Sequence, residues 1–427
     1  MLSSESRLFL LILFILLVLF AVLLYFFITT CQIDNFQEEE KNEKNERKEA
    51  NTNTNILDLK TKLKEIESVF FNNTTLEAHK KKYYDSVTIN TLNKYYKKGT
   101  ILVSVASYRD EQCIDTIRIL AQNADLPENL HFVICQQNNS ILDSDCLNWC
   151  ANTQYKNHKA CAKARKTIIR LKHTEARGPT WARFIIQQQY DGEEYFLQID
   201  AHTRMIRSWD TLLKNQLQYC PDIDKAILTQ LPCEYDIVSK TKRGQENDEK
   251  WRTDLLRGPL FVEKIDPKDH FFRIQSNYTE NEIKRQPFVS TAWVAGFSFS
   301  KANFIFDVPY DPYLPFLFFG EETDITLRAF THGYNFYSPT LSIVFHNYKR
   351  EHRNTFWEHP DQHKGELLSR LRLYAKFQFF DPDDLEHLLP KKYRFILTNL
   401  HRWNLGTERT IEEYEKFANI NVKPLIN

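Results

Sequence analysis

Two strand-like segments separated by a helical one constrain the fold of the middle of the chain. Residues 100–110, TILVSVASYRD, predict a buried strand that runs into a polar loop. Residues 113–124, CIDTIRILAQNA, predict a helix, and residues 130–137, LHFVICQQ, predict a second strand. Because a strand–helix–strand order places two strands in the same direction, the sequence predicts a parallel sheet of the α/β class.

The same alternation continues to residue 200. Residues 178–192, GPTWARFIIQQQYDG, have proline near a helix start and Asp-Gly at the helix end, and residues 193–200, EEYFLQID, predict the next strand. Ligands of open α/β sheets bind beyond the carboxyl ends of the strands, where SYRD and DAH both fall. Basic and acidic residues balance at 56 each and no nucleic-acid motif is present, so we expect no nucleic-acid partner.

The polar residues that end this strand, Asp200 and His202, are candidate metal ligands. If the extended backbone continues past the strand, alternate residues point to one face, so the carboxylate and the imidazole lie together. Such a pair suits a divalent cation such as Mn²⁺, and Zn²⁺ less well. Most Asp-x-His sequences are turn or capping residues, and that alternative stays open for the pair taken alone.

A further apolar segment, residues 341–346, ends in His346 and is followed by Lys349 and Arg350. We expect His346 to be a third metal ligand if the metal holds a diphosphate. Lys349 or Arg350 would then neutralise the charge that grows on the departing group. The alternative is a histidine that only forms a hydrogen bond at the end of a strand.

Residues 315–339 combine an aromatic run with an acidic corner. Glu321, Glu322 and Asp324 follow FLFFG at the start of a predicted helix, where acids stabilise a helix by ~0.3–1 kcal/mol without further function. The same acids beside a Phe-rich wall also suit a sugar, whose hydroxyls need acceptors and whose ring stacks on an apolar face. Gly296 lies between two strand-like runs, where the backbone can approach a ligand closely.

The N-terminal segment predicts the compartment. Residues 8–28 are an uncharged apolar run that, at ~1.5 Å per residue, spans the hydrocarbon core of a bilayer. Arg7 precedes the run and acidic residues follow it, so the positive-inside rule predicts a cytoplasmic tail of residues 1–7, a single-pass type II anchor and a luminal remainder. Residues 29–98 predict a stem that is charged and Asn-rich at first. Its later part has helical spacing and could form a coiled coil or pack on the globular domain.

The cysteines and sequons fit a luminal location. Cys146, Cys150 and Cys161 cluster in a polar stretch, where disulfides are favoured over a zinc site that lacks a regularly spaced fourth ligand. The pairing of the cysteines does not follow from the sequence. Sequons that predict a glycoprotein begin at Asn72, Asn73, Asn138 and Asn277.

Six segments occur in the order seen in one protein family. They are SVASYRD, ARGPTWARF, YFLQIDAHTR, the run from AGFSFSK to NFYSP, FHNYKR and LGTERTIEEYEKFANINV, and they span about residues 99–422. In these motifs the chain resembles the polypeptide α-N-acetylglucosaminyltransferases and, more distantly, the polypeptide N-acetylgalactosaminyltransferases. The resemblance implies a GT-A (nucleotide-diphospho-sugar transferase, Rossmann-like) fold over residues 99–350. It also implies a DxH motif, Asp200 and His202, that holds Mn²⁺ or Mg²⁺, with His346 as the late histidine that completes the metal site.

Further site residues follow from the same resemblance. It places Gly320 and Glu321 beside the donor sugar, and it implies nucleotide contacts from the first-strand loop, residues 107–110, and from one arginine-bearing segment; the residues named are Ser107, Tyr108, Arg109, Arg177 and Arg183. The chain departs from the family at Ala201, where many relatives have serine, but this side chain points away from the metal. Residues 351–427 predict a helical C-terminal extension packed on the catalytic domain, with no lectin-like module.

The resemblance implies a metal-dependent retaining transferase of the Golgi membrane. Its donor would be UDP-GlcNAc and its acceptor a polypeptide hydroxyl of threonine, serine or hydroxyproline, with Glu321 or Glu322 holding the sugar or the acceptor. A transferase for another UDP-sugar, such as GalNAc or galactose, is the nearest alternative. A membrane-anchored carbohydrate-binding protein without catalysis is the other. The sequence does not indicate the acceptor protein or the oligomeric state.

Overall fold

The computed structural model divides the chain into two compact units, Met1–Glu65 with Ile426–Asn427, and Ile66–Leu425. The structure describes residues 61, 63–70, 73–148, 163–235, 255–280, 286–349, 355, 359, 361–377 and 389–422. The expected anchor at residues 8–28 lies outside these residues. Among the residues that are described, no helix is long and apolar enough to cross a membrane. The anchor therefore stays a prediction.

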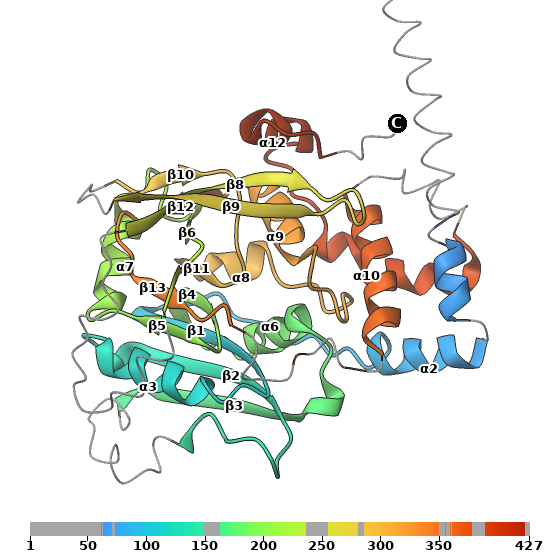
Figure 1. The fold of residues 1–427 in the computed structure, drawn as a ribbon, viewed down its shortest axis with the longest axis horizontal. Helices are drawn as coiled ribbons and strands as arrows, with labels where there is room; N and C mark the ends of the chain where they lie inside the picture. Colours follow the sequence, from blue (N-terminus) through green and yellow to red (C-terminus); the bar gives the residue numbers. More distant parts are fainter. Residues whose placement is uncertain are drawn as a thin grey trace, which may run out of the picture. The chain divides into compact units, whose positions relative to one another are not determined.

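An eight-stranded sheet forms the centre of the Ile66–Leu425 unit, in the order β10-β12-β6-β11-β4-β1-β2-β3 (Figure 1). Four neighbouring strands run parallel: β4 (Glu193–Asp200), β1 (Lys97–Tyr108), β2 (Leu130–Asn138) and β3 (Arg165–Lys172). On the other side, β11 (Phe297–Lys301) is antiparallel to β4 and to β6 (Ala226–Thr229), β12 (Asn335–Ser338) is parallel to β6, and β10 (Phe288–Ser290) is the edge. The three strands expected from the sequence are β1, β2 and β4, so the α/β prediction is confirmed.

Helices cover both faces of this sheet. On one face, Val103 and Val105 of β1 share a core cluster with residues of α3 (Cys113–Asn123) and α7 (Trp209–Gln218). The alternate residue Leu102 is also buried but lies outside this cluster, so it faces the other side. There α6 (Pro179–Gln187) contacts β1 and β2, and α8 (Asn303–Asp307) contacts β11. The result is the three-layer arrangement that an alternating strand–helix sequence produces.

The remaining described strands form two smaller sheets. The three-stranded sheet has the order β5-β13-β7, with β5 (Thr203–Met205), β13 (Val344–His346) and β7 (Cys233–Glu234). The other pairs β8 (Leu255–Ile265) with β9 (Phe272–Glu280). Short 3₁₀ helices occur at η1 (Pro127–Asn129) and η2 (His173–Glu175). The β5–β13 pairing matters most, because it brings residues 203 and 346 side by side.

The compact unit begins at Ile66, before the boundary that the sequence suggested at Gly99. Helix α2 (Asn73–Tyr83) and the residue after it pack through aromatic rings. The ring of Tyr83 meets that of Phe316 edge-on at 5.3 Å between centroids, and the ring of Tyr84 meets that of Phe395 at 4.7 Å. Lys82 also pairs with Asp361 at 3.0 Å, which places α2 beside the start of α10 (Figure 1). Residues 82–84 of the expected stem therefore pack on the globular domain. The choice between a coiled coil and packing for the helical patch before them stays open.

The described C-terminal residues include four helices, and α10 shares a buried network of charges with the rest of the unit. The helices are α10 (Gln362–Lys376), η6 (Lys391–Leu397), η7 (Leu400–Trp403) and α12 (Ile411–Ala418). Lys376 of α10 lies 2.8 Å from Asp324 and 3.0 Å from Asp311, and Arg372 pairs with Asp311 at 2.8 Å. The side chains of Asp311, Arg372 and Lys376 are fully buried. Charges at this depth are tolerated only because each has an opposite partner.

One disulfide joins Cys113, at the start of α3, to Cys146. The expectation of disulfides rather than zinc is met for Cys146, whereas Cys150 and Cys161 lie outside the described residues. Of the sequons, Asn138 is buried and its amide donates to the carbonyl of Ser144 at 2.9 Å, whereas Asn277 is exposed. Asn277 is therefore accessible to modification, whereas Asn138 is not.

Replacing the buried lysine with methionine, Lys376→Met, should lower the free energy of unfolding by about 3–5 kcal/mol, because Asp311 and Asp324 lose a cation they share. Urea unfolding followed by circular dichroism measures this change. Lys364→Met on the same helix is the control, since Lys364 is partly exposed, and it should stay within ~0.5 kcal/mol of the parent. Equal effects of the two substitutions would contradict a stabilising buried network.

Candidate functional site

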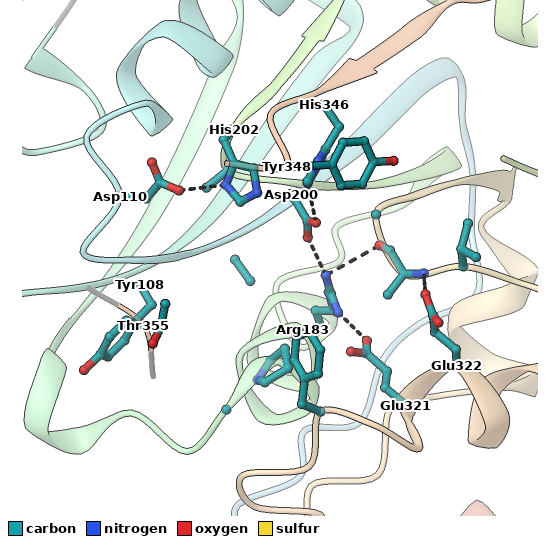
Figure 2. Close-up of a pocket in the computed structure, with 18 of the residues that line it drawn as sticks. Tyr108, Asp110, Arg183, Asp200, His202, Glu321, Glu322, His346, Tyr348 and Thr355 are labelled. Carbon is teal, nitrogen blue, oxygen red and sulfur yellow. Dashed lines mark hydrogen bonds and ion pairs between the residues drawn. The ribbon is translucent and has the colours of Figure 1, made fainter. Parts of the chain in front are cut away.

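A cavity of about 300 Å³ opens at the carboxyl ends of β1 and β4. Its wall includes residues of the loop after β1, the turn after β4, the segment before β11, the start of α9 (Glu321–Thr331) and the end of β13. This is the edge of the sheet where the sequence placed SYRD and DAH. The cavity collects most of the candidate side chains (Figure 2).

The three expected metal ligands lie together in this cavity. Strand β4 ends at Asp200, and β5 begins at Thr203, so the DxH motif occupies the turn between them. His346, at the end of β13, pairs in register with Thr203, which places its ring 4.4 Å from that of His202, centroid to centroid. Asp200, His202 and His346 each offer a ligand atom within 4.8 Å of the others. Among the described residues, no other set of three His, Cys, Asp or Glu side chains could hold a metal ion in this way. The residues present fit a divalent cation with mixed nitrogen and oxygen ligands.

Asp200 is held by two positively polarised neighbours. Its Oδ1 accepts a hydrogen bond from Arg183 Nη2 at 2.8 Å, and its Oδ2 lies 3.1 Å from His346 Nε2. Burial opposes ionisation of Asp200, but the hydrogen bond of His346 and the charge of Arg183 outweigh it. The pKa of the carboxyl is therefore held well below its usual range. Asp200 stays ionised at neutral pH, as a cation ligand must.

Arg183 also binds Glu321, so one guanidinium bridges two carboxylates (Figure 2). Arg183 is buried, and Glu321 is buried with it at the start of α9. The hydroxyl of Tyr310 lies 2.6 Å from Glu321 Oε1 and 3.0 Å from Gln198 Oε1. Burial raises the pKa of Glu321, although the charge of Arg183 opposes that rise. Glu321 is thus a member of a packed polar network rather than an open side chain.

Glu322 has a different environment. It lines the cavity, and its Oε1 accepts a hydrogen bond of 3.0 Å from the N–H of Ala295. Burial raises the pKa of the Glu322 carboxyl from 4.5 to about 7, against the Ala295 hydrogen bond, which lowers it. The structure therefore separates the two acids that the sequence could not rank.

Asp110 lines the cavity and makes one contact that the sequence analysis did not anticipate. Asp110, which ends the SYRD loop, was expected to contact a nucleotide. In the structure its Oδ2 lies 2.7 Å from Nδ1 of His202 (Figure 2). The signal available in the sequence was its position directly after a strand, which places it at the same sheet edge as Asp200.

Two glycines allow the backbone to form the cavity wall. A side chain at Gly296 would point at Asp200, with its Cβ 3.4 Å from Oδ2. Gly320 precedes α9 with φ of 111°, and a Cβ there would lie 2.9 Å from the ring of Phe271. Both glycines line the cavity, so their backbone is close to the space that a bound molecule would occupy.

The expected nucleotide contacts are only partly brought together. Tyr108 and Arg183 line the cavity, whereas Ser107 is buried and is not among the lining residues. Arg109 pairs with Asp143 at 2.9 Å. The guanidinium of Arg177 lies over Trp181 at 4.6 Å from the ring centroid and over Tyr83 at 5.3 Å. Neither of these two arginines lines the cavity, so their charges serve other contacts in this structure.

Of the two cations expected after β13, only Lys349 is among the described residues. Lys349 is exposed and is not among the lining residues, and Arg350 lies outside the described residues. Aromatic rings also line the cavity: Phe318 and Phe319 of the Phe-rich run noted in the sequence, and Phe272 and Tyr348, which the sequence analysis did not single out. Phe319 and Tyr348 are 42% and 40% exposed, so they offer apolar faces to a bound molecule.

The sequence profile described as glycosyltransferase (GlcNAc) matches residues 100–168 and 150–423. The chain belongs to this glycosyltransferase family. The matched residues include every residue that lines the cavity. No curated protein matches the chain.

Three solved structures are similar to this glycosyltransferase at low identity. GalNAc-T7 with UDP, GalNAc and Mn²⁺ has 14% identity and a TM-score of 0.44, over 75% of this chain and 55% of that one. TarS 1–349 of S. aureus in complex with UDP-GlcNAc has 13% identity and a TM-score of 0.39, over 70% of this chain and 73% of that one. The mannosyltransferase PcManGT from Pyrobaculum calidifontis in complex with GDP-Man and Mn²⁺ has 12% identity and a TM-score of 0.34, over 81% of this chain and 96% of that one. The glycosyltransferase thus spans about half the length of the GalNAc-T7 chain that it matches.

Glu322 should make the stability of the metal-free glycosyltransferase depend on pH. Its pKa is 4.5 when unfolded and about 7 when folded, so between these values the unfolded state loses its proton first. The contribution of Glu322 to the unfolding free energy therefore falls as pH rises from 4.5 to 7 and is constant outside that window. Glu322→Gln should gain on the order of 3 kcal/mol relative to the parent across the window. Urea unfolding in chelator at pH 4.5 and pH 8 tests this, and an unchanged difference would contradict the shift.

Proposed function

We propose that this glycosyltransferase has the GT-A fold and moves N-acetylglucosamine from UDP-GlcNAc to a hydroxyl of a polypeptide. The observation that carries the proposal is the meeting of Asp200, His202 and His346 with Glu322 around one cavity in a member of the glycosyltransferase (GlcNAc) family. A nucleotide-sugar donor needs a site for its diphosphate and acceptors for its sugar hydroxyls, and this cavity offers both kinds of group.

Asp200, His202 and His346 would hold the cation. Two imidazoles with one carboxylate favour Mn²⁺ over Mg²⁺, which prefers oxygen ligands and retained waters. When bound there, the cation would neutralise the negative charge of the donor diphosphate and of the departing nucleotide. The exposed Lys349 stays a candidate for a second positive charge on that group, and Arg350 stays a prediction.

Glu322 is the better candidate for a hydrogen bond to the sugar. The Oε1 of Glu321 already binds Arg183 and faces the hydroxyl of Tyr310, so its lone pairs are largely occupied. Glu322 lines the cavity with one backbone hydrogen bond. The exposed rings of Phe319 and Tyr348 would stack on the sugar or the acceptor.

The reaction would proceed with retention of the anomeric configuration. Under this proposal the acceptor hydroxyl gives its proton to the departing phosphate oxygen, so the protein mainly positions the reactants and stabilises the leaving group. Tyr108, Gly296 and Gly320 line the cavity where the donor would lie. The anomer of the product, read by proton NMR, distinguishes retention from inversion.

The proposed location is the Golgi lumen, with residues 8–28 as a type II anchor. The disulfide between Cys113 and Cys146 and the exposed sequon at Asn277 support an oxidising, glycosylating compartment. Endoglycosidase-sensitive mass on the full-length protein tests this location. No such mass in a host that modifies sequons would contradict it.

Turnover of a panel of UDP-sugars should be fastest with UDP-GlcNAc and should stop when the cation is chelated. His346→Ala should lower kcat/KM by at least ~100-fold, because it removes a metal ligand rather than an outer group. Release of UDP by the full-length protein measures both effects. His363→Ala, at an exposed histidine of α10, is the control and should leave activity unchanged. Preference for UDP-GalNAc or UDP-galactose would replace the donor in this proposal, and activity that is indifferent to chelator would overturn the metal site.

The two neighbouring glutamates should respond differently to substitution. Glu322→Ala should lower kcat/KM by about 10- to 100-fold without lowering the melting temperature at neutral pH, because one charged hydrogen bond to the sugar is lost. Glu321→Gln should lower the unfolding free energy by about 3 kcal/mol, because the buried Arg183 loses an anionic partner. Thermal melting and initial rates on both variants decide the assignment. The reverse pattern would make Glu321 the sugar-binding acid.

A further inference from the structure

We propose that Asp110 is a positioning residue that sets which nitrogen of His202 can bind the metal, and that it thereby sets part of the metal affinity of the site. The inference rests on the proposed metal site and goes beyond it, because Asp110 does not itself belong to the ligand group. Figure 2 shows the Asp110 carboxylate on the outer side of the His202 ring, away from Asp200 and His346.

The contact fixes the tautomer of His202. Asp110 Oδ2 lies 2.7 Å from His202 Nδ1, and both residues are buried, at 3% and 5% exposure. An ionised carboxylate can only accept a hydrogen bond, so Nδ1 must carry the proton. The lone pair of the neutral ring is then on Nε2, which is the nitrogen left to ligate a cation.

The Asp110 carboxylate is itself fixed in place. Its Oδ1 accepts a hydrogen bond from the N–H of Gln112 at 2.9 Å, and the carbonyl of Asp110 accepts one from the N–H of Cys113 at 3.3 Å. The side chain of Gln112 accepts a hydrogen bond from the hydroxyl of Tyr235 at 2.6 Å. Cys113 is joined to Cys146 by the disulfide. Few rotations are left to this carboxylate.

The same part of the chain holds the backbone of the metal motif. Thr116 of α3 donates from its hydroxyl to the carbonyl of Ala201 at 2.6 Å, and it accepts from the N–H of Thr203 at 3.1 Å. The turn that carries His202 is therefore bonded to α3 on both sides. The loop after β1 and the start of α3 thus act as one support that holds both the ring and the backbone of this ligand.

Replacing the carboxylate with an amide tests this role directly. In Asp110→Asn a single oxygen must serve two donors, His202 Nδ1 and the N–H of Gln112, where the carboxylate has two. If the oxygen stays with Gln112, the amide N–H₂ faces Nδ1 and favours the proton on Nε2, which removes the metal-binding lone pair. If it turns to His202, the loop loses the hydrogen bond of Gln112.

The chain offers a matched control at the opposite end of β4. Glu193 binds His131 through Oε1 and Nδ1 at 2.6 Å, and both are buried. This pair is also a carboxylate with an imidazole, but it lies at the first residue of the strand whose last residue is Asp200. Glu193→Gln therefore perturbs the same kind of bond without touching the cavity.

Isothermal titration of the full-length protein with Mn²⁺ alone should show a Kd about 10- to 100-fold higher in Asp110→Asn than in the parent. Glu193→Gln should bind Mn²⁺ within about twofold of the parent. Unchanged Mn²⁺ affinity in a folded Asp110→Asn overturns the role of Asp110 while leaving the metal site intact. Absence of Mn²⁺ binding in the parent overturns the proposed metal site itself.

The tautomer of His202 in the metal-free parent gives a second readout that needs no variant of Asp110. Nitrogen-15 NMR of labelled histidine should show His202 with its proton on Nδ1, and the resonance is assigned by its loss in His202→Asn. Finding the proton on Nε2 overturns the proposal even if Asp110→Asn fails to fold.

Discussion

The buried guanidinium of Arg183 is the interaction on which the arrangement of the site depends. It lies between Asp200, at the end of β4, and Glu321, at the start of α9, with one nitrogen facing each carboxylate. A buried cation is tolerated only with opposite charge around it, and each of these acids depends on the cation in turn. The metal motif and the helix that carries Glu322 are therefore fixed to a common point.

Helix α9 is held in the same way from its other side. Its first residue, Glu321, binds Arg183, and Asp324, one turn further along, binds Lys376 of α10 at 2.8 Å. Two buried cations, Arg183 of α6 and Lys376 of α10, thus bind carboxylates in the first turn of α9. The acids at this helix start, which could have been solvated residues that only stabilise the helix, are instead the anions that orient it. The C-terminal helices consequently support the site as well as the fold.

The features of the site that depend only on the direction of the strands could be predicted from the sequence. Parallel strands end at one edge of a sheet, so Asp200 and His202 could be placed at a ligand edge from residues 193–202 alone. The partnership with His346 depends on the pairing of β5 with β13, two three-residue strands too short to predict. Arg177 and Arg183 look alike in the sequence. Arg177, however, precedes Gly178, which has a φ of 88°, whereas Arg183 lies within α6. The guanidinium of Arg177 lies over Trp181, whereas that of Arg183 binds Asp200, and the sequence alone does not show this difference.

The two histidines of the site differ in a way that only the structure shows. His202 has a carboxylate behind its ring, whereas Nδ1 of His346, although buried, has no hydrogen-bond partner within the described part of the chain. The backbone beside His346 is nevertheless held, because the N–H of Asn347 donates to the carbonyl of His202 at 3.1 Å. The ring of His202 is thus held at Nδ1 by Asp110, and the ring of His346 is held at Nε2 by Asp200. A cation in the proposed site would therefore meet two imidazoles whose rings are held through different nitrogens.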